Sequence, residues 1–183
     1  MATKNRIIVP CRLAYMNCWT PSSNYNNKRY SLVALISKKD NKTIELVQNT
    51  IELVKEQSAD KWGGTIPNMI RLPLHDGDVE KPDNPIFQKN YYLNAKSKTA
   101  PQIVDEMVNP IVDHSQIYAG CYGNVSLVFY PYNVGGNKGI GVALGNIQKI
   151  KDGPFLNGQV SAKAEFAPVT EETINNENIF TDD

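Results

Sequence analysis

The clearest pattern of apolar and polar positions lies in residues 117–132, where the two kinds of side chain alternate. Successive side chains of a β-strand point to opposite faces of its sheet, so this alternation predicts a strand. The odd-numbered face is small to apolar and suits a core; it comprises Ala119, Cys121, Gly123, Val125, Leu127 and Phe129. The even-numbered face carries four tyrosines among small and polar residues: Tyr118, Tyr122, Tyr130 and Tyr132. A core needs only the first face, so the tyrosines require a separate explanation.

Two explanations fit the four tyrosines. Tyrosine is amphipathic and common on half-buried strand faces, so the rings can simply pack under a loop or a helix. Alternatively, aromatic rings at strand spacing form a platform on which unpaired bases stack, at about 1–3 kcal/mol per base and without regard to base identity. The rest of the chain has to decide between packing and base stacking.

A period of two also predicts a first strand over residues 6–19 and a second over 28–37. One face of the first strand comprises Ile7, Val9, Cys11, Leu13 and Tyr15, and Arg6 and Arg12 lie on the other. Pro10 has no N–H to donate to a ladder, so this strand is expected at a sheet edge or with a bulge.

Residues 91–98 predict a third strand of mixed character. Its inward face is expected to be Tyr91, Leu93 and Ala95, and its outward face Tyr92, Asn94, Lys96 and Lys98. A tyrosine and two lysines in register suit a groove that follows a nucleic-acid backbone, although an ordinary solvated strand has the same composition. Residues 117–132 and 140–150 complete the set as a fourth and a fifth strand, joined by a glycine-rich turn over 133–139.

One helix is predicted, from about residue 42 to residue 60. Asp40 or Asn41 can cap its start, and Gly63-Gly64 ends it. Its apolar stripe recurs at helical spacing and comprises Ile44, Val47, Ile51, Val54 and Ser58. A helix with one apolar face packs on a sheet, so a packing role is favoured over a binding role.

The order of elements is strand, strand, helix, long loop and three strands, since prolines and glycines leave residues 61–90 irregular. Residues 99–116 are expected to connect strands with one short extended piece at Ile103-Val104. This order predicts a mainly β chain, an OB-fold five-stranded Greek-key barrel with one capping helix and long loops, with a β-sandwich as the alternative. The barrel is expected to occupy residues 1–163, and residues 164–183 to form a disordered acidic tail.

Charge is divided unevenly along the chain, although the net charge is zero. All 19 basic residues lie at or before Lys163, whereas six of the 19 acidic residues follow it, so residues 1–164 carry +6 and residues 165–183 carry −6. A basic body with an acidic tail suits a protein that binds a polyanion, although a merely solvated end has the same composition. Three cysteines and no apolar signal segment predict reduced thiols in the cytoplasm, and no run of apolar residues is long enough for a membrane span.

Few residues suggest catalysis. His75, Asp76, Asp78 and Glu80 could hold a divalent cation, which makes a metal-dependent nuclease one alternative, but a Gly between acids is also an ordinary turn. The cysteines and the histidines His75 and His114 lack zinc spacing, and Gly135–Gly139 lacks the spacing of a phosphate-binding loop. The sequence therefore predicts no enzyme, no metal and no cofactor.

Candidate contacts with single-stranded nucleic acid combine cations for phosphates with rings for bases. The cations are Arg12, Lys61, Lys96, Lys98 and Lys138. The rings are Trp62, Tyr92, Tyr118, Tyr122, Tyr130 and Tyr132. Single-stranded RNA is a near alternative to DNA, and a β-rich interaction or virion protein whose tyrosines pack against a partner is a further one.

Several longer motifs resemble a known family, the phage-encoded single-stranded DNA-binding proteins of OB fold. These motifs are KWGG at 61–64, LPLHDGD at 72–78, NAKSKTAPQIVD at 94–105, YAGCYG at 118–123, NKGI at 137–140 and GNIQK at 145–149. The resemblance spans most of residues 6–160 and implies sequence-tolerant binding of unpaired DNA in phage replication or recombination, in the bacterial host and without catalysis. In phage and bacterial single-strand binders an acidic tail with a terminal aromatic recruits replication enzymes. Phe180, Asp182 and Asp183 resemble that device, with three residues after the aromatic.

Overall fold

A computed structural model describes residues 5–22, 28–156 and 162–171, and five of its strands close into a barrel. In order around the barrel they are β1 (Arg6–Asn17), β2 (Tyr30–Ser37), β4 (Asn90–Ser97), β7 (Asn137–Lys151) and β6 (Tyr122–Val134). Neighbours are antiparallel except β4 and β7, which close the barrel in parallel at Lys96 and Ala143. The barrel strands thus meet in the order first, second, third, fifth, fourth, which is the OB arrangement and confirms the predicted fold.

The predicted inward face of β6 is the centre of the core. Val125, Leu127 and Phe129 are each 0% exposed, as the alternation requires. The strand begins at Tyr122 rather than at 117, because Gly120 has a φ of 123° that a strand does not permit. It ends at Val134 in a two-residue turn, Gly135-Gly136, so the hairpin with β7 is longer than expected.

The predicted inward face of β1 is correct as far as Leu13, and beyond it the alternation of buried and exposed side chains is lost. Ala14 is buried beside it, and Tyr15 has a φ of 45° and is 48% exposed. The pairing of β1 with β2 shifts register between Ala14 and Asn17, which is a β-bulge. The inward placement of Tyr15 is therefore wrong, because a bulge changes which face each following side chain occupies. Pro10 lies where β1 pairs with β6 on one side, before its pairing with β2 begins at Arg12.

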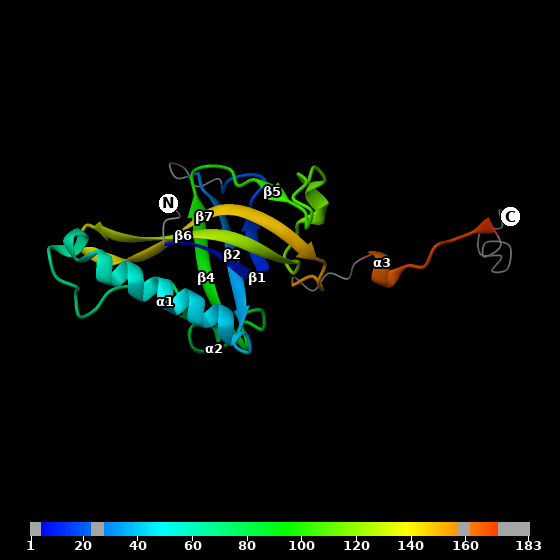
Figure 1. Cartoon of the computed structure of the whole chain (residues 1–183). Helices are drawn as coiled ribbons and strands as arrows, with labels where there is room; N and C mark the ends of the chain where they lie inside the picture. Colours follow the sequence, from blue (N-terminus) through cyan, green and yellow to red (C-terminus); the bar gives the residue numbers. More distant parts are fainter. Residues whose placement is uncertain (1–4, 23–27, 157–161, 172–183) are drawn as a thin grey trace.

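The predicted helix is α1 (Asn41–Gln57), and it lies along the β6–β7 hairpin (Figure 1). Asp40 caps it, accepting a hydrogen bond from the backbone N–H of Thr43 at 3.2 Å. Its predicted apolar stripe is buried against the barrel. The helix stops three residues early and continues as the 3-10 turn η1 (Ala59–Trp62), which ends at Gly63.

Short elements interrupt the long loops. β3 (His75–Asp76) and α2 (Gly77–Glu80) lie within the predicted irregular segment, and β3 pairs with β4. β5 (Ile103–Val104) is the predicted extended piece and pairs with β7, while η2 (His114–Gln116) and α3 (Ala162–Glu165) were not expected. Among the described residues, none of the helices has the length and apolar character that crossing a membrane requires.

Candidate nucleic-acid interface

Two of the four tyrosines lie on glycines of the neighbouring strand. Tyr130 pairs across the hairpin with Gly141, and Tyr132 pairs with Gly139. A Cβ added to Gly141 would lie 2.6 Å from Cζ of Tyr130, and one added to Gly139 would lie 2.6 Å from the hydroxyl of Tyr132. Each tyrosine ring therefore lies over the backbone of β7, in space that the side chain of any residue other than glycine would occupy at position 139 or 141. Tyr130 is 43% exposed, so its ring is accessible to a ligand.

These rings line a groove together with cationic side chains. The groove has a volume of about 440 Å³, and the residues that give it its character are Arg71, His75, Asn94, Lys96, Tyr130 and Tyr132. We call these six residues the tyrosine groove. Arg71 reaches it because its backbone extends the edge of β7: its N–H donates to Lys138 at 3.0 Å, and its carbonyl accepts from Ile140 at 2.9 Å. Lys96 reaches it because β4 closes the barrel next to β7.

The tyrosine groove includes Asn94 and Lys96 of β4, one of the strands that form the face with which OB folds bind single strands. That face is formed by the second and third barrel strands and by the loops that follow the first and the fourth. Here these strands are β2 and β4, and the second of the loops is the turn of the β6–β7 hairpin. Cations and rings on one such face are able to neutralise phosphates and to stack bases together.

Tyr118 and Tyr122 are held in a different environment, beneath the segment that follows β7. The hydroxyl of Tyr118 donates to Asp152 at 3.0 Å, and its ring contacts Phe155 at 4.4 Å between centroids. Arg12 and Lys151 lie over the ring of Tyr122 at 5.3 and 4.9 Å. The structure therefore places Tyr118 and Tyr122 outside the tyrosine groove, a separation from Tyr130 and Tyr132 that parity alone does not make.

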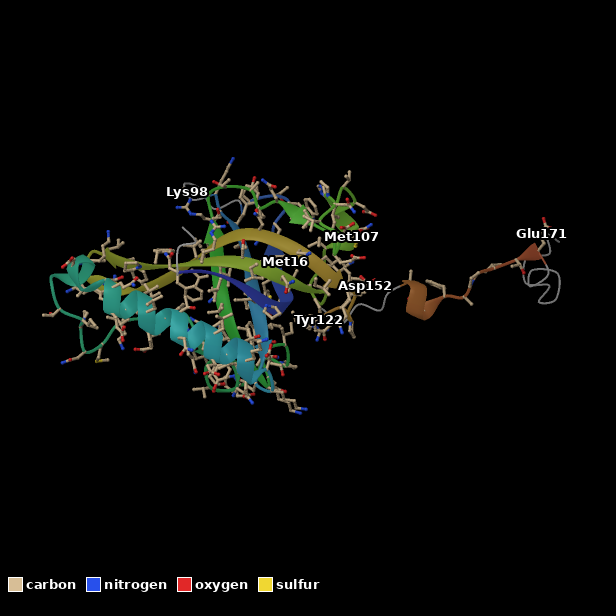
Figure 2. All side chains as sticks on the ribbon, viewed as in Figure 1. Met16, Lys98, Met107, Tyr122, Asp152 and Glu171 are labelled. Carbon is tan, nitrogen blue, oxygen red and sulfur yellow. The ribbon has the colours of Figure 1, made fainter. Side chains whose placement is uncertain are left out.

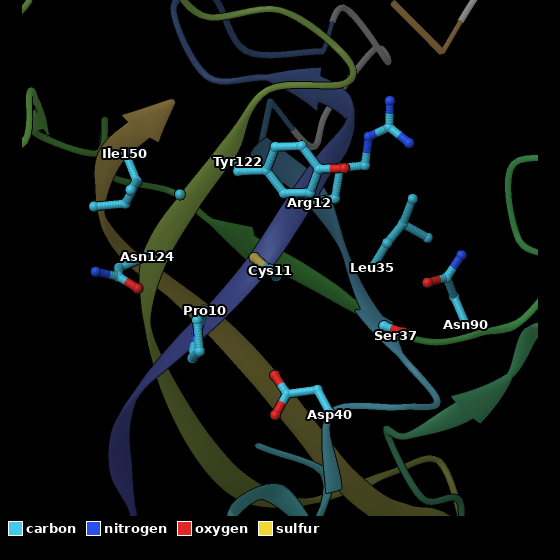
Figure 3. A pocket seen from close by; sticks show the side chains of 11 residues that line it. Pro10, Cys11, Arg12, Leu35, Ser37, Asp40, Asn90, Tyr122, Asn124 and Ile150 are labelled. Atoms are coloured by element: carbon cyan, nitrogen blue, oxygen red, sulfur yellow. The ribbon is translucent and has the colours of Figure 1, made fainter. Parts of the chain in front are cut away.

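A second hollow, of about 590 Å³, opens where β1 and β2 separate beside Tyr122 (Figure 3). Arg12 and Tyr122 lie at one end of it, and Asp40 lies at the other (Figure 3). Arg12 is tied down by three contacts, because besides Tyr122 it donates to the carbonyls of Gly120 at 3.0 Å and Pro154 at 2.6 Å. Its guanidinium thus fastens β1 to the chain after β7.

Two predicted stacking rings are buried, which corrects the sequence prediction. Trp62 is 2% exposed, and its Nε1–H donates to the carbonyl of Tyr132 at 3.0 Å. Tyr92 is 5% exposed because Phe87, from the loop before β4, covers the outward face on which parity placed it. Burial and the nearby Glu80 raise the pKa of Tyr92 to about 12. Neither ring offers a face to a base.

The remaining predicted cations are distributed along the molecule. Lys96 lies in the tyrosine groove, and Lys98 lies just beyond it, on the opposite side of the barrel from Tyr122 (Figure 2). Lys61 is exposed beside the hairpin, where its carbonyl accepts from Asn133 at 3.3 Å. Lys138 donates to the carbonyl of Trp62 at 3.1 Å and so holds η1 on the hairpin. The tail residues Phe180, Asp182 and Asp183 lie outside the described residues.

The acidic loop considered for a metal already binds a lysine. Nζ of Lys38 lies 2.7 Å from a carboxylate oxygen of Asp76 and 2.7 Å from one of Asp78. His75 pairs with Glu80 at 2.7 Å. Within the described ranges, no three His, Cys, Asp or Glu side chains are grouped to hold a metal ion. The structure thus gives no support to the nuclease alternative, because an ammonium group occupies the position between the two aspartates.

The sequence reasoning missed Arg71, and no local signal marks it, because its place in the groove depends on an isolated backbone pairing with Gly139. Asn94 was predicted on the outward face of its strand together with Lys96, and His75 was considered for a metal. The groove was therefore recognisable in part, from Lys96 and from the even-numbered tyrosines of β6.

The barrel, its capping helix and this groove together define an OB-fold protein with a candidate single-strand interface. The chain belongs to the family whose model is described as Enterobacter phage Enc34, ssDNA-binding protein, which matches residues 4–179. The resemblance drawn from the sequence motifs is thereby confirmed. A relative from Acyrthosiphon pisum secondary endosymbiont phage 1, protein p50, is 32% identical over 168 residues, which cover 85% of this chain and 88% of that one.

Solved structures share the fold. The single-stranded DNA-binding protein from bacteriophage Enc34 in complex with ssDNA matches with a TM-score of 0.72 and 22% identity, over 82% of this chain and 88% of that one. The single-stranded DNA-binding protein gp2.5 of bacteriophage T7 matches with a TM-score of 0.53 and 13% identity, over 94% of each chain. At these identities the likeness shows a common fold.

Proposed function

We propose that this protein binds single-stranded DNA without reading its sequence, and that the tyrosine groove is the centre of the interface. The observation that carries the proposal is the placement of the Tyr130 and Tyr132 rings on glycines, beside Lys96 and Arg71. Every base has a π-face, so stacking on tyrosine accepts any sequence. Membership in a family described by ssDNA binding supports the same function.

In this proposal each part of the groove has a separate task. Tyr130 and Tyr132 stack bases, while Arg71 and Lys96 neutralise the phosphates between them. Lys98 and Lys61 extend the cationic path beyond the two ends of the groove. The protein acts without catalysis in the replication or recombination of phage DNA, in the cytoplasm of the bacterial host. Incubation of labelled DNA with the protein and Mg²⁺ or Mn²⁺ checks the absence of catalysis, and cleavage would contradict it.

A titration followed by fluorescence anisotropy tests the binding itself. Labelled single-stranded DNA, single-stranded RNA and duplex DNA of equal length are compared. Strong preference for the single-stranded DNA is expected. Tyr130→Ala should weaken binding by about 1 kcal/mol or more, whereas Tyr130→Phe, which keeps the ring, should bind nearly as well as the native chain. Tyr122→Ala is the matched control outside the groove, and its binding should resemble that of the native chain if it stays folded. Equal loss in both alanine variants would remove the groove from the proposal.

A second proposal concerns the acidic C-terminal segment. Residues 165–183 carry −6 against the +6 of the preceding chain, so the segment is able to compete with DNA for the cationic groove. Phe180, Asp182 and Asp183 would then engage replication or recombination proteins once DNA has displaced the segment. Deleting residues 165–183 should raise the affinity for single-stranded DNA at low salt. Unchanged affinity there would discard the competition and leave only partner recruitment.

A further inference from the structure

Trp19, which follows β1, stacks on the imidazole of His114, which begins η2. The two ring centroids lie 4.0 Å apart, and the planes differ by 8°. This is parallel stacking, the arrangement in which an aromatic side chain holds a nucleobase. The two residues are far apart in the sequence, so the contact joins the loop after β1 to the loop between β5 and β6.

The indole of Trp19 is held differently from that of Trp62, the other tryptophan. Nε1–H of Trp62 donates a hydrogen bond to Tyr132, which fixes that ring in the core. Nε1 of Trp19 is buried and has no hydrogen-bond partner among the described residues. Trp19 packs partly against the core, whereas the imidazole stacked on it belongs to an exposed residue. The described contacts of its ring are therefore packing and stacking, without the polar anchor that a buried indole usually has.

The location of Trp19 continues the tyrosine groove. Lys96 in the groove pairs with Ser31 of β2, and Ser31 pairs with Asn17 at the end of β1, two residues before Trp19. Asn17 also donates to the hydroxyl of Ser31 at 3.3 Å, so this row of the sheet is polar and exposed. From β6 the path runs across β7, β4 and β2 to β1, which is four strand spacings, or roughly 20 Å along the barrel surface. The loop that follows the first barrel strand is one of the two with which OB folds bind single strands.

We propose that Trp19 is a further base-stacking site for single-stranded DNA, and that His114 covers it in the free protein. An unpaired base replaces the imidazole on the indole, and the loop that carries His114 moves aside. The inference rests on the proposed function, because it extends the same interface. The exchange is favoured by tethering: a base of a strand already bound in the tyrosine groove reaches Trp19 at high effective concentration. His114 prevents the indole from facing water before DNA arrives.

Intrinsic fluorescence together with anisotropy tests the inference on the full chain. Titration with unlabelled single-stranded DNA should quench tryptophan fluorescence in the native protein, because a base stacks on Trp19. In Trp19→Phe only Trp62 remains, and its core position should leave its fluorescence unchanged while the anisotropy of labelled DNA still reports binding. Trp19→Ala should bind about fivefold or more weakly than Trp19→Phe, since the phenyl ring still stacks.

His114→Ala provides a second, independent readout. Removing the covering ring should tighten binding by about two- to tenfold, the value of one aromatic pair. This variant tests the covering role even if Trp19→Ala fails to fold. Binding in the native chain with unchanged fluorescence would overturn the stacking site, and so would equal quenching in Trp19→Phe. Weaker or unchanged binding in His114→Ala would overturn the covering role. A complete absence of binding by anisotropy would instead contradict the proposed function.

Discussion

Gly139 and Gly141 shape the proposed interface through the side chains that they lack. Replacing Gly141 by Ala would place a Cβ 2.6 Å from Cζ of Tyr130, so the ring has to lift from β7. We expect the affinity of Gly141→Ala for single-stranded DNA to fall about fivefold, the lower end of the value of one stacked base. Anisotropy titrations measure the affinity, and circular dichroism verifies the fold. Native affinity in a folded Gly141→Ala variant would show that a flat Tyr130 is not required.

The three cysteines are shielded residues rather than reactive ones. Burial raises the pKa of Cys11 and of Cys18 to about 12, and it raises the pKa of Cys121 as well. Only the thiolate is nucleophilic, so at pH 8 these thiols should resist alkylation. Mass spectrometry after iodoacetamide treatment should find the native protein unmodified and the urea-unfolded protein modified at all three. Rapid labelling of the native protein would contradict the burial of these side chains.

At the scale of elements, Lys38 fastens β3 and α2 to the end of β2. Its ammonium group hydrogen-bonds Asp76 and Asp78, which lowers the pKa of each carboxyl from its ordinary 3.8. A carboxyl group whose pKa is lower in the folded than in the unfolded chain stabilises the fold at any pH above its unfolded-state pKa. This stabilisation is lost as the pH falls through the pKa that the group has in the folded chain. The native chain should therefore lose stability on acidification below about pH 4.

Lys38→Met tests this attachment. The variant removes the cation, so its carboxylates repel each other at pH 7 and gain nothing from ionisation. Its melting temperature should be lower than that of the native chain at pH 7, and it should fall less between pH 7 and pH 3. Calorimetric scans at both values measure the difference. A parallel decrease in the two proteins would mean that this pair of contacts does not contribute to the acid dependence.

Most elements were predictable because periodicity marks them directly. The stripe of α1 and the alternation of β6 both record which side chains meet the core, and both predictions are confirmed. The order of these elements favoured the barrel over the alternative β-sandwich, since a helix and five strands with long loops suit the OB arrangement. The ends of the strands were predicted less accurately. Gly120 delays the start of β6, and the turn between β6 and β7 is only Gly135-Gly136, shorter than the predicted glycine-rich turn over 133–139.

The candidate site was harder to predict, because alternation identifies a face but not what covers it. Tyr92 and Lys96 share the outward face of β4, yet Phe87 covers Tyr92 and leaves Lys96 exposed. Tyr122 and Tyr130 share the outward face of β6, yet Arg12 and Lys151 lie over the ring of the first, whereas the second is 43% exposed. Trp62 was assigned to an exposed loop, but η1 turns it into the core. Each outcome depends on contacts between residues distant in the sequence.

At the scale of the whole molecule, the proposed interface is largely electrostatic. Each phosphate neutralised by a lysine or an arginine releases counterions, so the logarithm of the affinity should fall linearly with the logarithm of the salt concentration. Lys96→Gln should reduce the steepness of that line by about 0.7, the contribution of one phosphate contact on a single strand. Anisotropy titrations at several salt concentrations give the slope. Lys55→Gln, on α1, is a control that should keep the native slope.

Pro10 has a consequence for the behaviour of the protein at high concentration. An unpaired stretch of strand is a template for another chain, and growth from such edges leads to aggregation. The hydrogen-bonded pairing of β1 with β2 ends at Arg12, so the preceding part of β1 is unpaired on that side. Pro10 lies in this unpaired part and has no N–H to donate. A foreign strand added there would lack a hydrogen bond at its centre. The chain thus carries its own protection against edge-to-edge assembly at the place where β1 separates from β2.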